Sequence, residues 1–285
     1  VESFRFRTTD SPYCNQEMVA ELKAKLGTQR ALQELDAHFL SDATACFDPE
    51  DLRAVITDEV FPVRGERLSI GIDLAKEKDF SVAILQNEFG EVWCLGRWQG
   101  QDWSVLRDQF LAYLKKWPDV ALVVDLGGGG GYGGMLVDML KRELPDKRDH
   151  ARIHGVKTGH SGPKAQLMET LIADVQNHRL RVCAGPLVDV LRHEMVFFEQ
   201  RRYISGGVER WRYHSPQTDG EHDDMVVALA LSLHGRLYAW DKTDPLAGDF
   251  HGFGAGTTAG KSARTATSTT RTLGGFGAAG GRYRY

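Results

Sequence analysis

Residues 68–73, Leu68-Ser69-Ile70-Gly71-Ile72-Asp73, form a short apolar run that ends on a carboxylate. A run of this kind favours a buried β-strand. Two more strand-like segments follow at residues 80–86 and 91–98, and the turn-forming residues 87–90 separate them. We interpret the order as three strands linked by hairpins, which predicts an antiparallel unit that begins near residue 68.

The chain continues with alternating helical and strand patterns. We expect helices at residues 103–117, 134–144, 163–177 and 186–200, strands at 120–126 and 153–156, a hairpin at 203–213 and an apolar helix at 222–240. The strand at 120–126 is almost continuously apolar, as in a strand buried on both faces. The sequence therefore predicts an α/β fold, with a mixed central sheet of three antiparallel strands followed by parallel strands, flanked by helices.

Two segments differ in composition from this central part. Residues 1–62 are polar and helix-like, with helices expected at 16–26 and 28–40, and we interpret them as a linker or small helical subdomain. Residues 63–240 form the predicted main domain. Residues 241–285 are rich in Gly, Ser, Thr and Ala, so we expect a disordered tail. The chain begins at Val1 rather than Met, which leaves open that it is a fragment of a longer protein.

Composition excludes several classes of protein. The 285 residues are 42% hydrophobic and 26% charged, as in ordinary soluble domains. No apolar run reaches the roughly 18 residues of a membrane helix, and no signal peptide is recognisable. Four scattered cysteines without a C-x-x-C spacing argue against zinc clusters and disulfides, and favour a reducing cytosol.

Charge is unevenly distributed along the chain. The net charge is −4, which argues against a protein that coats nucleic acid by bulk charge. From His251 onward the chain carries five basic residues and no acid, so this segment is +5 and the remainder is −9. A local basic channel beside an acidic site remains compatible with this balance.

Acidic residues fall at the ends of predicted elements. Asp73 ends the first strand, Asp125 ends the fourth, and Asp223 and Asp224 open the last helix. If the first and fourth strands are neighbours, Asp73 and Asp125 lie side by side, and the helix can bring Asp224 to them. Converging carboxylates repel one another, and a hard divalent cation with oxygen ligands relieves that repulsion. Such a site suits phosphodiester hydrolysis with two metal ions.

Each acidic residue also has a purely structural interpretation. An aspartate after a strand often forms a turn or caps the next helix, and Asp223 and Asp224 suit the first turn of a helix by dipole. His222 adjoins Asp223 and is either an assisting residue or an ordinary hydrogen-bonding histidine. The glycine run at 127–131 fits a phosphate cradle, a loop kept small for a bulky polymer, or plain flexibility.

A glycine-containing stretch near the C-terminus superficially resembles a nucleotide-binding motif. Residues 256–262 resemble a phosphate-binding P-loop, but three residues separate the glycines where that motif requires four. We therefore expect no nucleotide cofactor for this chain.

The acidic motifs as a set resemble those of a known family. Gly71-Ile72-Asp73, Val123-Val124-Asp125 and the stretch from His222 to Ala230 are similar to the three acidic motifs of the nuclease domain in large terminase subunits of tailed bacteriophages. The resemblance spans about residues 67–240, and its most specific part is His-Asp-Asp before an Ala/Leu-rich helix. The N-terminal segment resembles the linker between that family's ATPase and nuclease domains.

The resemblance implies an RNase H-like fold and a metal-dependent endonuclease that cuts concatemeric viral double-stranded DNA during genome packaging, in the cytoplasm of the infected bacterial host. It makes Asp73 the metal-bridging carboxylate, Asp125 the second ligand and Asp224 the ligand on the helix, with Asp223 assisting or capping. The cofactor would be Mg²⁺ or Mn²⁺, with two ions expected. Expected partners are the portal and the small terminase subunit, with no membrane. The family's ATPase motifs are absent from these residues, and the glycine run is longer than expected.

Two other interpretations stay open. The segments around Asp73 and Asp125 also resemble the phosphate loops of actin-like and sugar-kinase ATPases, although the 52 residues between them are too few for an intervening lobe. A non-cutting module of the packaging motor would instead bind DNA through basic side chains. The candidates for such contacts are Lys157, Lys164, Arg201, Arg202, Arg210 and Arg212.

Overall fold

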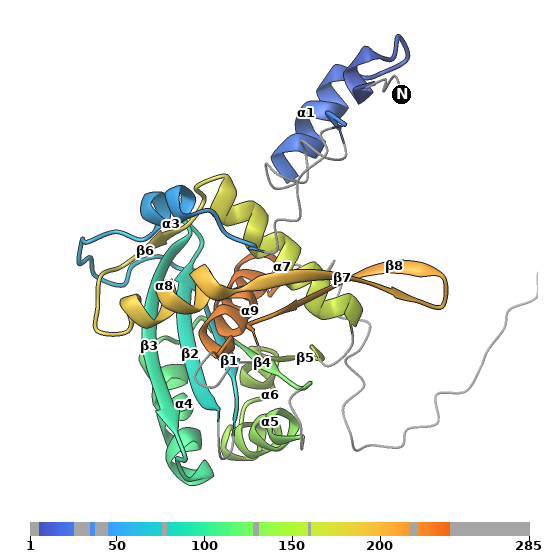
Figure 1. Ribbon diagram of the computed structural model, residues 1–285. Coiled ribbons are helices and arrows are strands. Elements are labelled where there is room, and N and C mark those ends of the chain that lie inside the picture. Colours follow the sequence, from blue (N-terminus) through green and yellow to red (C-terminus); the bar gives the residue numbers. More distant parts are fainter. Residues whose placement is uncertain are drawn as a thin grey trace, which may run out of the picture. The chain divides into compact units, whose positions relative to one another are not determined.

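A central sheet organises the computed structural model, which describes residues 6–25, 35–37, 45–75, 79–127, 131–158, 161–216 and 222–239 (Figure 1). The strands of this sheet are β1 Leu68–Asp73, β2 Phe80–Asn87, β3 Glu91–Gln99, β4 Val120–Asp125, β5 Ile153–Val156 and β6 Arg181–Val182. Their order across the sheet is β5-β4-β1-β2-β3-β6. The sheet therefore places β1 between β4 and β2, near its middle.

The directions of the strands are mixed. β1 pairs antiparallel with β2, and β2 antiparallel with β3, whereas β4 runs parallel to β1 and β5 parallel to β4. The predicted sheet, with three antiparallel strands followed by parallel ones, is confirmed. β6 was not predicted; it pairs parallel with β3 over two residues, which is too short for an alternating pattern to show in the sequence.

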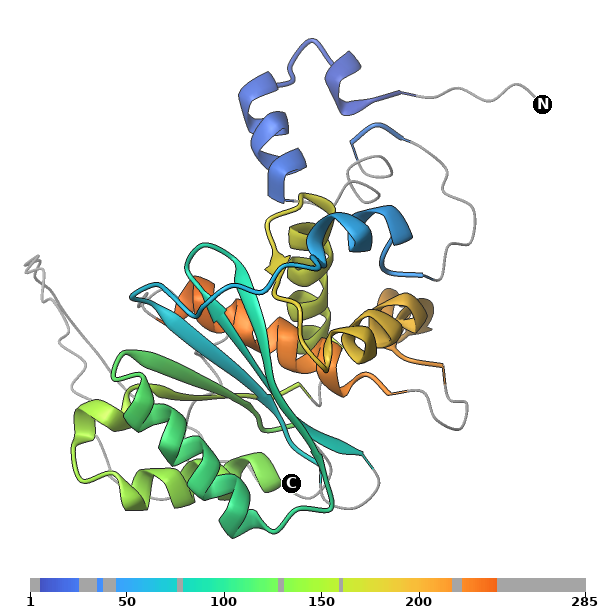
Figure 2. The same cartoon turned by 90° about the vertical axis from the view of Figure 1, so that its left-hand side faces the viewer.

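Helices cover both faces of the sheet (Figure 2). One face packs against α9 Asp224–Tyr238, with α7 Ser161–Gln176 and α8 Val188–Phe197 beside it. The other face packs against α4 Trp103–Lys116 and α5 Tyr132–Glu143. Alternation along β1 divides its side chains accordingly, since Ile70 and Ile72 belong to the α4–α5 core whereas Gly71 faces α9.

Short helices precede and connect these elements. They are η1 Thr8–Asp10, α1 Gln16–Lys25, α3 Pro49–Val55 and α6 Lys147–His150. α1 lies where the sequence predicts it. Most of the helix predicted at 28–40 falls outside the described residues, and residues 35–37 form a turn in which Ala37 has a φ of 50°.

The α3 helix belongs to the core of the sheet. Its buried residues Leu52 and Val55 join the same apolar cluster as α7 and α9, and the Thr57 backbone N–H donates to the Val182 carbonyl. Sequence patterns missed α3, and its packing extends the α/β body back to about Cys46. The division at residues 62 and 63 stays a prediction about domain organisation.

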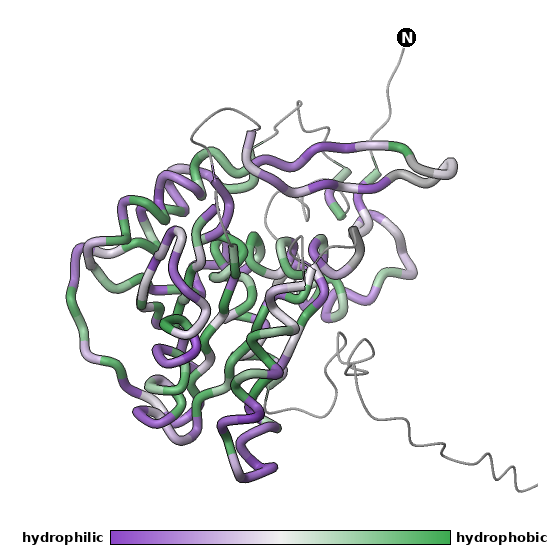
Figure 3. The backbone as a smooth tube through the Cα atoms, turned by 90° about the horizontal axis from the view of Figure 1, so that it is seen from below, coloured by the Kyte–Doolittle hydropathy of each residue, from purple (hydrophilic) through white to green (hydrophobic). Residues whose placement is uncertain are grey.

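A β-hairpin stands apart from the central sheet. Its strands are β7 Glu199–Ser205 and β8 Val208–His214, and both glycines of the predicted turn, Gly206 and Gly207, have positive φ. Figure 3 shows the hairpin as a mostly hydrophilic projection. The helix predicted at 186–200 is shorter than expected, because Phe198 is extended and buried and leads directly into β7.

The described helices give no membrane span, since none combines sufficient length with sufficient apolar character to cross a bilayer. Residues 240–285, which include the predicted tail, lie outside the described part of the chain.

Candidate metal centre

The predicted carboxylates meet at one edge of the sheet. β1 and β4 pair in parallel with Ile72 opposite Val124, so Asp73 and Asp125 are the next residues on neighbouring strands. Both strands end at this edge, where α9 begins with Asp224. Besides burial, the charges of Asp125, Asp224 and Asp223 raise the pKa of Asp73, so the four carboxylates lie close enough to interact electrostatically.

Because α9 packs closely on β1, its first residue, Asp224, lies where β1 and β4 end. A Cβ atom on Gly71 would lie 2.0 Å from the Ala228 carbonyl oxygen and 2.3 Å from the Ser232 nitrogen, so only glycine allows this approach. The Phe80 backbone N–H, at the start of β2, donates to Asp224 Oδ2 at 3.1 Å. Asp224 is therefore held by both the helix backbone and the neighbouring strand.

Asp125 is the most firmly held carboxylate. Its Oδ1 accepts from the Thr158 hydroxyl at 2.6 Å, from the Thr158 backbone N–H at 3.3 Å and from the Gly127 backbone N–H at 2.7 Å. The bond to Gly127 is the turn-forming role that a purely structural interpretation expects. All three bonds fall on Oδ1, which leaves Oδ2 available to a cation.

The charge of Asp73 is poorly compensated. Removal of water by the surrounding protein, followed by repulsion from Asp125, Asp224 and Asp223, raises the pKa of Asp73 well above its ordinary value. Lys164 is the positive group that lowers it. No described residue donates a hydrogen bond to this carboxylate, so its ionised form lacks the support that Asp125 has.

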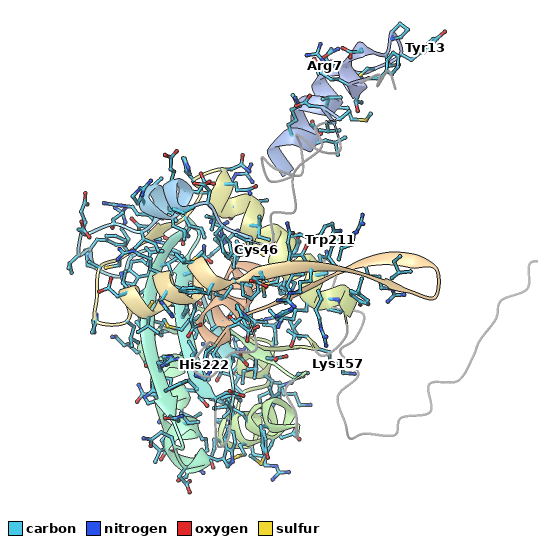
Figure 4. The ribbon with its side chains drawn as sticks, viewed as in Figure 1. Arg7, Tyr13, Cys46, Lys157, Trp211 and His222 are labelled. Atoms are coloured by element: carbon cyan, nitrogen blue, oxygen red, sulfur yellow. The ribbon has the colours of Figure 1, made fainter. Side chains whose placement is uncertain are left out.

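The pKa of Asp224 is also raised above its ordinary value. Burial raises its pKa to about 6, and nearby Asp223 and Asp79 add to that, while the bond from Phe80 and the ring of His222 act against it. His222 Nδ1 lies 3.7 Å from Asp224 Oδ2 and 3.6 Å from Asp79 Oδ1. His222, labelled in Figure 4, thus lies beside the carboxylates of Asp224 and Asp79.

Asp223 is the N-cap residue of α9, but its side chain is engaged in an ion pair. Its Oδ2 lies 3.1 Å from Lys164 Nζ, and its side chain makes no capping hydrogen bond with α9. Of the two roles that the sequence left open for Asp223, side-chain capping is not observed. Lys164, predicted as a DNA contact, lies inside the carboxylate cluster and neutralises part of its charge.

The chemistry of these residues fits a divalent cation. Four aspartates supply hard oxygen ligands, and the raised pKa values of Asp73 and Asp224 mark an excess of negative charge that a cation would relieve. Among the described residues, no group of three acidic, histidine or cysteine side chains is already arranged to enclose a metal ion.

The remaining basic candidates make no ion pair with these carboxylates among the described contacts, and Lys157 directly precedes Thr158, which donates to Asp125. Lys157 is exposed just after β5 (Figure 4), and the four hairpin arginines are exposed on β7 and β8. Cross-strand pairing puts Arg201 opposite Arg212, with Arg210 two residues along, so these three share one face. Arg202 lies opposite Trp211 on the face that packs toward the core. Glu199 pairs with Arg201 at 3.1 Å.

Sequence reasoning missed several residues around the site. Thr158 supports Asp125 because β5 is the neighbour of β4, a pairing that no local pattern reveals. Arg97 and Glu194 form a buried ion pair behind Asp224, and burial raises the pKa of Glu194 to about 7. The sequence signal for this ion pair is Glu194 itself, a charged residue at a position of α8 where the pattern calls for an apolar one.

Solved structures share this architecture. The crystal structure of the large terminase nuclease from thermophilic phage G20c matches with a TM-score of 0.51 at 22% identity, covering 66% of this chain and 97% of that one. The same nuclease with bound magnesium matches at 21% identity and with bound cobalt at 20%, each with a TM-score of 0.52 over 67% of this chain and 97% of the other. No family model and no curated protein matches the sequence.

These likenesses define the class of fold. The chain has the RNase H-like α/β fold of large terminase nuclease domains, as the resemblance of its acidic motifs predicted. At these identities the likeness establishes the fold, and the activity has to be argued from the site.

Proposed function

We propose that this chain is a metal-dependent endonuclease that cuts double-stranded DNA during the packaging of a phage genome. The observation that carries the proposal is the meeting of Asp73, Asp125 and Asp224, from two parallel strands and one helix, with too little positive charge to balance them. A site that is purely structural would gain nothing from such repulsion.

Each residue has a distinct task in this proposal. Asp73, flanked by the other carboxylates, would be the central metal ligand, and Asp125 and Asp224 would hold the ions from either side of it. Two bound Mg²⁺ or Mn²⁺ ions would supply charge stabilisation at the phosphate and acidify the attacking water. Lys164 balances Asp223 and can pair with a phosphate oxygen of the DNA. His222, beside Asp224, would exchange a proton with a reacting oxygen.

The cofactor and the partners are inferred from this site and from the fold. Carboxylate oxygens favour Mg²⁺ or Mn²⁺ over softer metals, and the similar G20c nuclease has been crystallised with magnesium and with cobalt. We propose that the chain works in the host cytoplasm, with portal and small terminase subunits as partners. The exposed arginines of the hairpin, together with Lys157, are the proposed contacts to DNA backbone.

The structure favours this function over an actin-like ATPase. That alternative requires its two phosphate loops on separate lobes, whereas the segments around Asp73 and Asp125 follow neighbouring strands of one sheet. A non-cutting DNA-binding module differs from the proposal in activity alone, so an assay has to separate the two.

Plasmid nicking and linearisation tests the proposal. We expect cutting with Mn²⁺ or Mg²⁺, none with EDTA, and a loss of roughly a hundredfold or more in Asp73→Ala. Asp119→Ala is the matched control, because this exposed aspartate precedes β4 at the opposite edge of the sheet. ATP hydrolysis without cutting would support the actin-like alternative, and DNA binding without cutting would support the binding module.

A further inference from the structure

A buried ion pair lies directly behind Asp224. Arg97, on β3, has its Nη2 atom 3.2 Å from Glu194 Oε1, on α8, and the two side chains are 15% and 2% exposed. Burying two charges costs free energy that a pair of apolar side chains would not. An arrangement of this kind is therefore poorly explained by stability alone.

Glu194 fixes the first turn of α9. Its second oxygen, Oε2, accepts a hydrogen bond from the Met225 backbone N–H at 2.7 Å. The first N–H groups of a helix have no acceptor within the helix, and a negative charge at this end is favourable. Met225 directly follows Asp224, so this bond fixes the backbone that carries the Asp224 side chain.

Arg97 is linked to Asp224 indirectly, through Phe80. Its guanidinium carbon lies 3.3 Å from the centre of the Phe80 ring, and the Phe80 N–H is the group that donates to Asp224 Oδ2. The Phe80 ring also meets the His222 ring edge-on, with centres 5.2 Å apart. The ion pair therefore touches both residues whose backbone N–H groups locate Asp224.

A cavity beside this pair gives Phe80 room to move. It has a volume of about 300 Å³ and is lined by Phe80, Arg97, Val190, His193, Glu194 and His222. Packing on that side of Phe80 is incomplete. The contact with Arg97 therefore restrains the ring, as close packing restrains side chains elsewhere in the core. Without the guanidinium, the ring could shift into the cavity and take its N–H away from Asp224.

We propose that Arg97 and Glu194 are positioning residues for Asp224, with Glu194 acting through the Met225 N–H and Arg97 acting through Phe80. The inference rests on the proposed function, in which Asp224 is a metal ligand. A ligand held in place before the cation arrives loses less conformational freedom on binding, so the pair should raise metal affinity.

The test compares two isosteric variants of the full chain. Glu194→Gln keeps the shape of the side chain and removes the charge that Arg97 requires. Asp174→Asn is the matched control, because Asp174 is also a buried carboxylate, and one of its two arginine partners, Arg236, lies near the other end of α9. Both variants should unfold at a lower temperature than the parent chain, so thermal unfolding alone does not separate them.

Two further readouts do separate them. In Glu194→Gln we expect amide hydrogen exchange at Phe80, followed by NMR without metal, to speed up about tenfold, and the Kd for Mn²⁺ in calorimetry to rise about tenfold. Asp174→Asn should change neither. Arg97→Lys, which keeps the charge but loses the flat guanidinium, should speed up exchange at Phe80 more than at Met225.

The possible failures are distinguishable. If Phe80 exchanges equally fast in Glu194→Gln and in the parent chain, or if Asp174→Asn gives the same increase, the positioning role is wrong. If the parent chain neither binds Mn²⁺ nor cuts DNA, the proposed function is wrong, while the metal-free exchange still reports whether the pair holds Asp224.

Discussion

Lys164 Nζ lies 3.1 Å from Asp223 Oδ2, although 59 residues separate the two in the chain. Lys164 sits in the first part of α7, and Asp223 precedes α9. The same lysine also lowers the pKa of Asp73, against repulsion from several carboxylates. It acts as a counter-ion that belongs to the protein, and a bound cation would share that task.

Removing this counter-ion should make the cluster more dependent on metal. In Lys164→Gln we expect the metal-free protein to lose about 1 kcal/mol of stability, because the pair is partly exposed, which corresponds to roughly 2–4 °C in Tm. The rise in Tm on adding Mn²⁺ should be larger than in the parent chain. Differential scanning fluorimetry checks both, and an equal Mn²⁺ effect in the two proteins would count against the role of Lys164.

Metal should stabilise the protein more at high pH than at low pH. The pKa of Asp224 rises from 3.8 to about 6 on folding, and that of Asp73 also rises. Ionising such groups opposes folding, so their contribution to stability is full below about pH 4 and is lost as the pH rises through about 6. A cation at a hundred times its Kd should restore about 2.7 kcal/mol.

Thermal unfolding with EDTA and with Mn²⁺ measures this effect. We expect a gain of about 5–10 °C from Mn²⁺ near pH 8 and little gain near pH 4, where the carboxylates are protonated. The double variant Asp73→Asn, Asp224→Asn should show a flatter pH dependence without metal. An equal gain at both pH values would contradict the assignment of these carboxylates.

Gly71→Ala should be strongly destabilising. The added Cβ would collide with the Ala228 carbonyl oxygen, which is backbone and cannot rotate away, so α9 would have to shift from β1. We expect a loss of about 3 kcal/mol or more in the free energy of unfolding, measured by urea denaturation. Gly134→Ala in α5 is the control, since a Cβ there meets nothing within 4 Å and should stabilise the helix by up to about 1 kcal/mol.

The hairpin arginines should contribute to DNA binding through charge. In Arg210→Gln combined with Arg212→Gln we expect weaker binding, and a slope of log K against log salt that is less steep by about 2. Arg53→Gln is the control, because Arg53 is an exposed arginine of α3 on another part of the body. Fluorescence anisotropy with a DNA duplex at several salt concentrations measures the slopes. Equal slopes would remove these arginines from the interface.

Local sequence patterns were enough to predict most strands of the sheet and the candidate carboxylates. Apolar runs that end on Asp73 and Asp125 are local patterns, and each records that a strand is buried up to a polar end. The apolar helix after Asp224 is similarly local, since all its residues from Met225 to Gly235 are buried. Elements of this kind could be predicted because burial along a whole element leaves a continuous run of apolar residues. β6 and α3 could not, because they are too short or too polar to show one.

The hydrogen bonds and ion pairs of the carboxylates follow from tertiary packing and have no local signal in the sequence. Thr158 reaches Asp125 through strand pairing, Lys164 reaches Asp223 from another helix, and Glu194 reaches the start of α9 from α8. These contacts join residues that are 31 to 59 positions apart in the chain. Hydrogen bonds and charge balance depend on distances in space, which a pattern of neighbouring residues does not encode. The sequence thus determines which carboxylates are available, and the packing of α9, α7 and α8 on the sheet decides their charge and orientation.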